Sequence, residues 1–124
     1  MTNNAAVDAS GPRIDSQEEL AFLRAWKHAV APVSGYFGGL PAVLAATDKD
    51  QLKPDMPAIR EHLSLISTAE EAYLIALVSF FNTALAERLV AESRSNQLIG
   101  HMAGRLSKER RHAIAQLVET YCGW

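Results

Sequence analysis

The sequence predicts an all-α fold, a compact bundle of four to five helices around one long central helix. Alanine and leucine outnumber the β-branched residues that favour strands, and only 7% of the chain is aromatic. Apolar residues recur at three- and four-residue steps, and serine precedes three of these segments, where its hydroxyl can cap a helix. The chain contains no pair of alternating apolar segments joined by a tight turn, which is the pattern of a β-hairpin.

The composition is that of a single globular domain. The chain has 124 residues, of which 48% are apolar and 21% charged. Residues 1–14 lack both the basic and the apolar part of a signal peptide, so we expect a disordered leader there and one helical domain over residues 15–124. The single cysteine, Cys122, fits a reducing compartment, and the apolar segment 72–78 is too short to cross a bilayer. We expect a cytoplasmic protein that does not enter membranes.

The first helix is expected to begin at Asp15 or Ser16 and to stop before Pro32. Ser16 and Glu19 have the spacing of a capping box, in which each side chain satisfies a backbone N–H group at the start of the helix. Leucine, phenylalanine, tryptophan and valine then follow at helical spacing. Proline ends the helix because it has no backbone N–H to donate.

The segment that follows is expected to form a loop and two shorter helices. Residues 33–41 contain three glycines, so we expect a loop that displays Tyr36 and Phe37. A short helix over 41–46 begins with proline, which is favoured in a first turn. A polar connector with two prolines leads to a helix over 56–66.

Residues 67–92 predict one long helix. Ser67 and Glu70 form a second capping box, and neither proline nor glycine interrupts the helix after it. Its first three turns are apolar nearly all round, whereas a surface helix needs only one apolar stripe. Three short helices cannot be expected to cover both flanks, so one flank should stay exposed for a partner.

That flank is the predicted partner interface. Its anchors stand at three- and four-residue steps, the spacing of a helix that packs into a groove. A homodimer that pairs this flank about a two-fold axis would cover it, or another protein would. The predicted interface residues are Leu74, Leu77, Val78, Phe81 and Leu85, with Tyr36, Phe37 and Trp124 at the rim.

The last part of the chain predicts a weak helix and a strong one. Two glycines weaken the helix over 97–106, and Ser107 caps a final helix whose apolar stripe runs from Ala113 to Tyr121. Residues 93–112 carry a formal charge of +4 in a chain whose net charge is −2. The alternative function is therefore a DNA-associated helical protein that uses the basic final helix. No polar residue beside its cations is placed to read base edges, so direct nucleic-acid binding is the less favoured interpretation.

No enzymatic or metal-binding pattern emerges from the sequence. Glu109 and His112 have the spacing of one half of a helical di-iron site, but the second Glu-x-x-His pair that such a site needs does not occur. Cys122 is better explained as a small apolar residue at a helix end than as a nucleophile. We expect a non-enzymatic protein without a metal or cofactor.

The chain length, the all-helical layout and the helix STAEEAYLIALVSFFNTALAERLVAE resemble the small bacterial quorum-sensing antiactivators of the QslA type. The resemblance covers most of the chain after Asp15 and rests on overall character rather than on a motif, so it assigns no functional residue by position. A member of that family binds the ligand-binding domain of a LuxR-type transcription regulator, blocks its dimerisation and keeps it off DNA. The resemblance implies a dimeric adaptor that acts on such a regulator.

Overall fold

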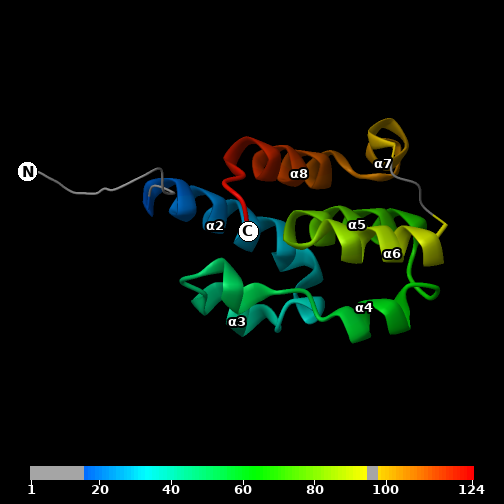
Figure 1. The fold of residues 1–124 in the computed structure, drawn as a ribbon, viewed down its shortest axis with the longest axis horizontal. Coiled ribbons are helices and arrows are strands. Elements are labelled where there is room, and N and C mark those ends of the chain that lie inside the picture. The colour runs from blue at the N-terminus through cyan, green and yellow to red at the C-terminus, as the bar shows by residue number, and fades with distance from the viewer. Residues whose placement is uncertain (1–15, 95–97) are drawn as a thin grey trace, which may run out of the picture.

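The computed structural model describes residues 16–94 and 98–124. These residues form seven α-helices and two 3-10 helices (η) without a strand, which confirms the predicted all-α fold. In chain order the elements are α2 (Ser16–Val30), η1 (Ala31–Tyr36), α3 (Leu40–Ala45), η2 (Lys49–Leu52), α4 (Met56–His62), α5 (Thr68–Phe81), α6 (Thr83–Glu92), α7 (Ile99–Arg105) and α8 (Lys108–Thr120). In Figure 1, α3 and α4 lie along one side of the molecule and α7 and α8 along the other, with α5 and α6 between them.

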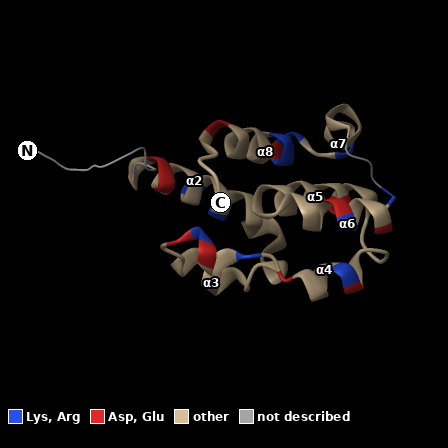
Figure 2. Ribbon diagram, viewed as in Figure 1, with Lys and Arg blue, Asp and Glu red and all other residues tan. Residues whose placement is uncertain are grey.

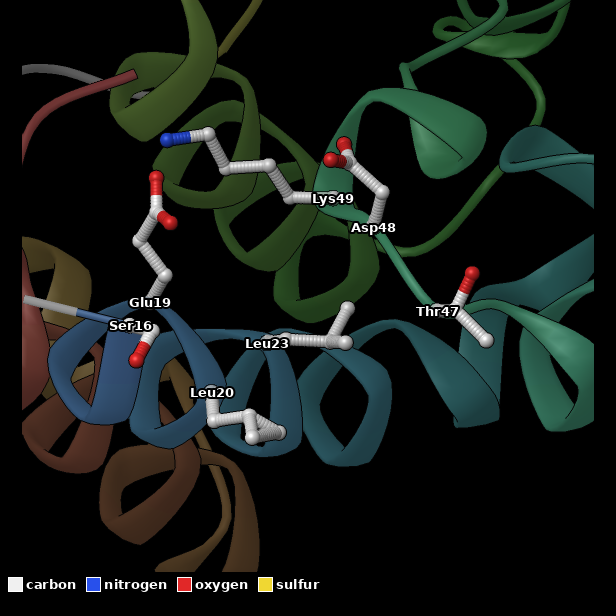
Figure 3. A pocket seen from close by; sticks show the side chains of 7 residues that line it. All are labelled: Ser16, Glu19, Leu20, Leu23, Thr47, Asp48 and Lys49. Carbon is white, nitrogen blue, oxygen red and sulfur yellow. The ribbon is translucent and has the colours of Figure 1, made fainter.

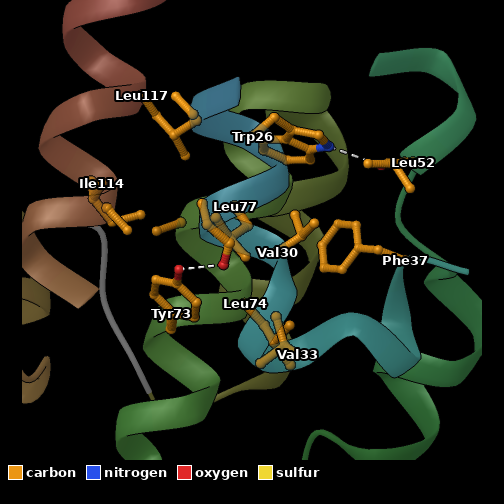
Figure 4. Packing of buried hydrophobic residues seen from close by; sticks show 14 of the residues in the cluster. Trp26, Val30, Val33, Phe37, Leu52, Tyr73, Leu74, Leu77, Ile114 and Leu117 are labelled. Carbon is orange, nitrogen blue, oxygen red and sulfur yellow. Dashed lines mark hydrogen bonds between the residues drawn. The ribbon is translucent and has the colours of Figure 1, made fainter. Parts of the chain in front are cut away.

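Helix α2 supplies one wall of the main hydrophobic core and packs along α8. Its residues Phe22, Trp26 and Val30 are fully buried. The indole Nε1–H of Trp26 donates a hydrogen bond of 3.0 Å to the backbone carbonyl of Leu52, so the one polar atom of this buried ring is satisfied. Figure 4 shows this bond and the side chains of α8 that close the core.

Helix α5 is the central element, and every residue from Glu71 to Val78 is buried. Tyr73 lies at the centre of the main core, where its hydroxyl donates a hydrogen bond to the backbone carbonyl of Ala29 (Figure 4). This bond joins α5 to the last turn of α2. The predicted cap is confirmed, because the backbone N–H of Glu70 donates to the Ser67 hydroxyl at 3.1 Å.

The prediction of one long helix over residues 67–92 is wrong, because Asn82 divides it into α5 and α6. Asn82 has an extended backbone (φ −160°, ψ 112°). Its backbone N–H donates to the carbonyl of Val78 at 2.8 Å, and its Oδ1 accepts a hydrogen bond of 3.0 Å from the backbone N–H of Leu85. One asparagine therefore ends the first helix and caps the second.

Helices α5 and α6 form an antiparallel hairpin. After α6 ends, the backbone N–H of Arg94 donates a hydrogen bond of 3.2 Å to the carboxylate of Glu71, near the start of α5. Leu89 of α6 packs with Ile75 and Val78 of α5 in a second hydrophobic cluster, which also contains residues of α4. Helix α6 therefore covers the side of α5 that faces away from α2.

The other α-helix boundaries follow the predicted ones with small differences, whereas the first part of the expected loop over 33–41 lies in η1, which runs to Tyr36. The helix expected over 56–66 ends at His62, and Asp55 caps it by accepting a hydrogen bond from the backbone N–H of Ala58. The Ser107 cap of the last helix is confirmed by its hydrogen bond from the backbone N–H of Arg110. Residues 16–94 and 98–124 contain seven α-helices rather than four or five, since the central helix is divided and the weak glycine-containing segment forms α7.

The predicted leader over residues 1–14 lies outside the described residues. Among the helices that the structure describes, none combines the length and the apolar character that crossing a bilayer requires.

Candidate interaction groove

Four of the eight predicted interface residues belong to the interior. Their side chains are fully buried: Leu74, Leu77, Val78 and Phe37. The prediction that one flank of the central helix stays uncovered is therefore wrong. The physical reason is the break at Asn82, because α6 folds back over one flank while α2 and α8 cover the other. Three of the five residues on the flank where a homodimer was expected, Leu74, Leu77 and Val78, are therefore interior.

The glycine-containing segment also buries one of the two aromatics that it was expected to display. The Phe37 ring packs edge-on against Trp26, with a centroid distance of 5.6 Å. Tyr36 is half-buried and lies edge-on to His62. Burial, reinforced by the nearby Glu70 carboxylate, raises the pKa of Tyr36 above its usual value.

The other three predicted interface residues are half-buried. Phe81 and Leu85 lie on either side of the break at Asn82, and Trp124 packs on the Phe81 ring at a centroid distance of 5.2 Å. The structure thus places Phe81 and Trp124 in contact, whereas Tyr36 lies against His62 and does not form a common rim with them.

The surface that the structure offers instead is a groove between α7 and α8, with a volume of about 660 Å³. Its floor and walls are mostly apolar, and its polar side chains come from α8. It is lined by Ile99, Met102, Ala103, Leu106, Arg111, Ile114, Ala115, Gln116, Val118 and Glu119.

Two aliphatic side chains at the groove are strongly exposed. Ile99, in the first turn of α7, is 76% exposed, and Val118, in the last turns of α8, is 63% exposed. Leu98, which directly precedes α7, is 71% exposed. Large aliphatic side chains gathered at one groove are typical of a site that is covered in a complex.

The groove exists because α7 is short and contributes little to the core. The segment that connects it to α8 turns at Leu106, which is buried, and at Ser107, which caps α8. No residue of α7 itself is fully buried. Gly100 and Gly104 have open space where a Cβ would stand, so α7 presents a low ridge and not a second core face.

The cations of the basic segment are largely engaged by the protein itself. Arg110 lies 3.7 Å from a carboxylate oxygen of Glu70, with its guanidinium 4.6 Å from the Tyr73 ring centroid. Arg111 donates a hydrogen bond of 2.7 Å from Nη1 to the backbone carbonyl of Leu106. Figure 2 shows the positive charge of α8 confined to its first turns, beside α7. These contacts hold α8 to its neighbours and do not form a row of cations aimed at solvent.

A second, smaller pocket of about 190 Å³ lies between the start of α2 and η2. Figure 3 shows its mixed lining, with the carboxylates of Glu19 and Asp48 and the ammonium of Lys49 around the apolar Leu23. Charged side chains of both signs line this pocket together with only two leucines, so it lacks the extended apolar lining of the α7–α8 groove.

Across residues 16–94 and 98–124, no group of three or more histidine, cysteine, aspartate or glutamate side chains could hold a metal ion. The pair considered for a di-iron site, Glu109 and His112, is exposed on α8. The reactive-residue candidate Cys122 is half-buried.

Sequence reasoning missed Ile99 and placed Val118 on the core stripe of the last helix. A signal for the first was present, since Ile99, Met102 and Leu106 stand at three- and four-residue steps in the segment read as a weak helix. Comparison with known proteins gives no further guidance, because no family model, curated protein or solved structure matches this chain.

Proposed function

We propose that this protein is a non-enzymatic regulatory binder that takes up a protein partner in the groove between α7 and α8. The observation that carries the proposal is the exposure of aliphatic side chains at one place, with Ile99 76% and Val118 63% exposed on facing helices. A groove of this kind accepts an apolar ridge, most simply one side of a partner helix. The proposal replaces the flank of the central helix, which is buried, as the contact surface.

The polar side chains at the groove suit a specific protein contact. Arg111, Gln116 and Glu119 flank the apolar floor and can pair with polar groups at the edge of an interface. The apolar lining offers packing and water exclusion. Interfaces of this type depend on a few central side chains, so single substitutions should have large effects on affinity.

We further propose that the partner is a transcription regulator of the LuxR type, whose dimerisation and DNA binding the protein blocks. The support is the resemblance in size and helical character to the QslA-type antiactivators. The mechanism is steric: a regulator helix held in the groove is no longer available to its second copy. Repression of DNA binding would then be stoichiometric, without turnover.

The experiment measures release of a LuxR-type regulator of the same organism from its labelled operator duplex by fluorescence anisotropy. Wild-type protein should release the regulator at about one equivalent. Val118→Glu, which places a charge at the groove, should need more than about tenfold higher concentration, a loss of about 1.4 kcal/mol or more in binding. Failure of the wild-type protein to bind the regulator would refute the partner assignment.

The matched control is Leu65→Glu. Leu65 is 76% exposed and does not line the groove, so this variant introduces the same charge at a similarly exposed aliphatic position. It should release the regulator as the wild-type protein does. If both variants released the regulator equally poorly, the groove would not be the contact site, even if the regulator were the correct partner.

A further inference from the structure

The segment Tyr121–Trp124, called the strap below, leaves α8 and folds back over the aromatic residues of the main core. Tyr121 ends the helix with an extended backbone (φ −62°, ψ 126°). Gly123 has a φ of 92°, a left-handed conformation that is costly for residues with a side chain. In Figure 1 the strap is the red trace that runs from α8 to the centre of the molecule.

The indole of Trp124 is held among three aromatic rings from α2 and α5. Its centroid lies 4.9 Å from that of Trp26, 5.2 Å from that of Phe81 and 6.0 Å from that of Phe22. The interplanar angles are 75°, 88° and 90°, so each contact is edge to face, an arrangement favoured by the ring quadrupoles.

Two polar contacts from η2 hold the strap in place. The Nζ of Lys49 donates a hydrogen bond of 2.7 Å to the carbonyl of Gly123, and it lies 5.4 Å from the centroid of the Trp124 ring. The indole Nε1–H of Trp124 donates a hydrogen bond of 2.8 Å to Oδ1 of Asp50. Asp50 is exposed, and water competes for contacts of this kind, so each is worth only a modest free energy.

The rings beneath the strap are fixed by other parts of the protein. Trp26 is fully buried, donates its own indole N–H to Leu52, and stacks on Phe22 at a centroid distance of 6.0 Å. Phe37 also packs against the Trp26 ring, edge to face. Trp124 is only half-buried. The strap can therefore leave by a local opening, while the surface on which it packs persists.

We propose that the strap closes an aromatic binding site, and that a partner protein segment carrying an exposed tryptophan opens the site by displacing Trp124. The strap shows the chemistry that fits: an indole edge-on among three rings, an N–H donor for Asp50 and a backbone carbonyl for Lys49. An intramolecular competitor acts at an effective concentration of about millimolar, so only a segment that adds contacts of its own displaces it. This site is separate from the α7–α8 groove and does not depend on the function proposed for that groove.

The first experiment uses the indole N–H signals of the two tryptophans in a ¹⁵N-labelled protein, which report the strap and the core separately. The Trp124 proton should exchange with water faster than the Trp26 proton. Lys49→Ala, which removes one strap contact, should accelerate exchange at Trp124 by about tenfold or more and leave Trp26 unchanged. Lys53→Ala, at an exposed lysine just beyond η2, is the control and should change neither rate.

The second experiment tests the site itself. Trp124→Ala protein is titrated with a peptide of residues 119–124 carrying serine at position 122, and with the same peptide carrying alanine in place of tryptophan. The tryptophan peptide should shift the Trp26 indole signal saturably, and the alanine peptide should not. A folded variant that responds to neither peptide overturns the proposal.

The exchange rates decide the question if Trp124→Ala does not fold. Equal exchange of the two indole protons in the wild-type protein, with equal acceleration of both by Lys49→Ala, would show that Trp124 opens only with the core. The strap would then be a part of the core, and the proposal would be wrong.

Discussion

The backbone N–H of Arg94 donates a hydrogen bond of 3.2 Å to the carboxylate of Glu71, although 23 residues separate them in the chain. Nε of Arg94 lies 3.7 Å from the other carboxylate oxygen, and Glu71 is only 1% exposed. The contact brings the end of α6 back to the start of α5. It follows that the most apolar part of the sequence is a hairpin of two helices, which conceals its own apolar surface.

The hairpin predicts a short distance between spin labels at Ala69→Cys and Ala91→Cys, in a Cys122→Ser background. A continuous helix would separate these positions by about 33 Å at about 1.5 Å per residue. In the hairpin the labels should lie within about 20 Å, because neighbouring helix axes are about 8–10 Å apart. Pulsed electron spin resonance measures the difference directly.

A control pair on α5 alone, Ala69→Cys with Ser79→Cys, should give about 15 Å whether or not the helix continues past Asn82. A main distance near 33 Å for the first pair, with the control as expected, would restore the single long helix that the sequence predicts.

Because the carboxylate of Glu71 is buried, the stability of the protein should depend on the Arg94 side chain that pairs with it. Arg94→Ala removes the guanidinium from Glu71 and also a hydrogen bond of 2.8 Å from the arginine side chain to the carbonyl of Ile66. We expect the free energy of unfolding to fall by about 1–2 kcal/mol. Arg88→Ala, at an exposed arginine of α6, should change it by less than about 0.5 kcal/mol. Urea unfolding of both variants provides the comparison, and equal stabilities would contradict a structural role for the Arg94 side chain.

Much of the local structure is predictable because it depends on neighbours in the chain. The serine caps at Ser67 and Ser107 fix two helix starts, and the proline after Ala31 fixes the end of α2. The break at Asn82 was not predictable in the same way. Asparagine is tolerated within helices, and what favours a cap there is the packing of α6 on α5, a contact between distant residues.

The candidate groove was hidden for a related reason. Ile114 and Val118 stand one turn apart on α8 and have the same apolar character, so periodicity assigns both to the core. In the structure Ile114 is 8% exposed and Val118 is 63% exposed. Which of the two is covered depends on where α2 and α5 cross α8, and no local pattern in the chain encodes those crossings.

A charge introduced on the buried part of α5 should destabilise the fold rather than only block partner binding. Leu77→Arg would abolish partner binding and leave the fold intact if Leu77 were an interface residue. Because Leu77 is fully buried, we expect this variant to unfold or to lose more than about 4 kcal/mol, since an unpaired charge in an apolar core is very costly. Leu65→Arg, at a leucine that is 76% exposed, should fold normally. Circular dichroism distinguishes the two outcomes, and native helix content in Leu77→Arg would mean that its side chain can reach solvent or a partner.

Tyr73 should make stability depend on pH in the alkaline range. Its hydroxyl is buried and donates to the carbonyl of Ala29, and burial raises its pKa to about 12, although the nearby Arg110 guanidinium lowers it in part. An unfolded tyrosine titrates near pH 10. Between these values the unfolded state loses a proton that the folded state retains. The stabilising contribution is therefore complete below pH 10 and is lost as the pH rises through 12.

Tyr73→Phe tests this directly because phenylalanine cannot ionise. At pH 8 the variant should be less stable than the wild-type protein by about 1 kcal/mol, since it leaves the Ala29 carbonyl without its hydrogen-bond donor. Between pH 10 and 12 the wild-type protein should lose stability more steeply, by up to about 2 kcal/mol relative to the variant, so the two curves converge and can cross. Urea unfolding at closely spaced pH values, with the difference below pH 9 as the baseline, gives the measurement. A difference that stays constant up to pH 11.5 would show that the Tyr73 hydroxyl ionises as readily in the folded protein as in the unfolded chain, which is incompatible with its place at the centre of the core.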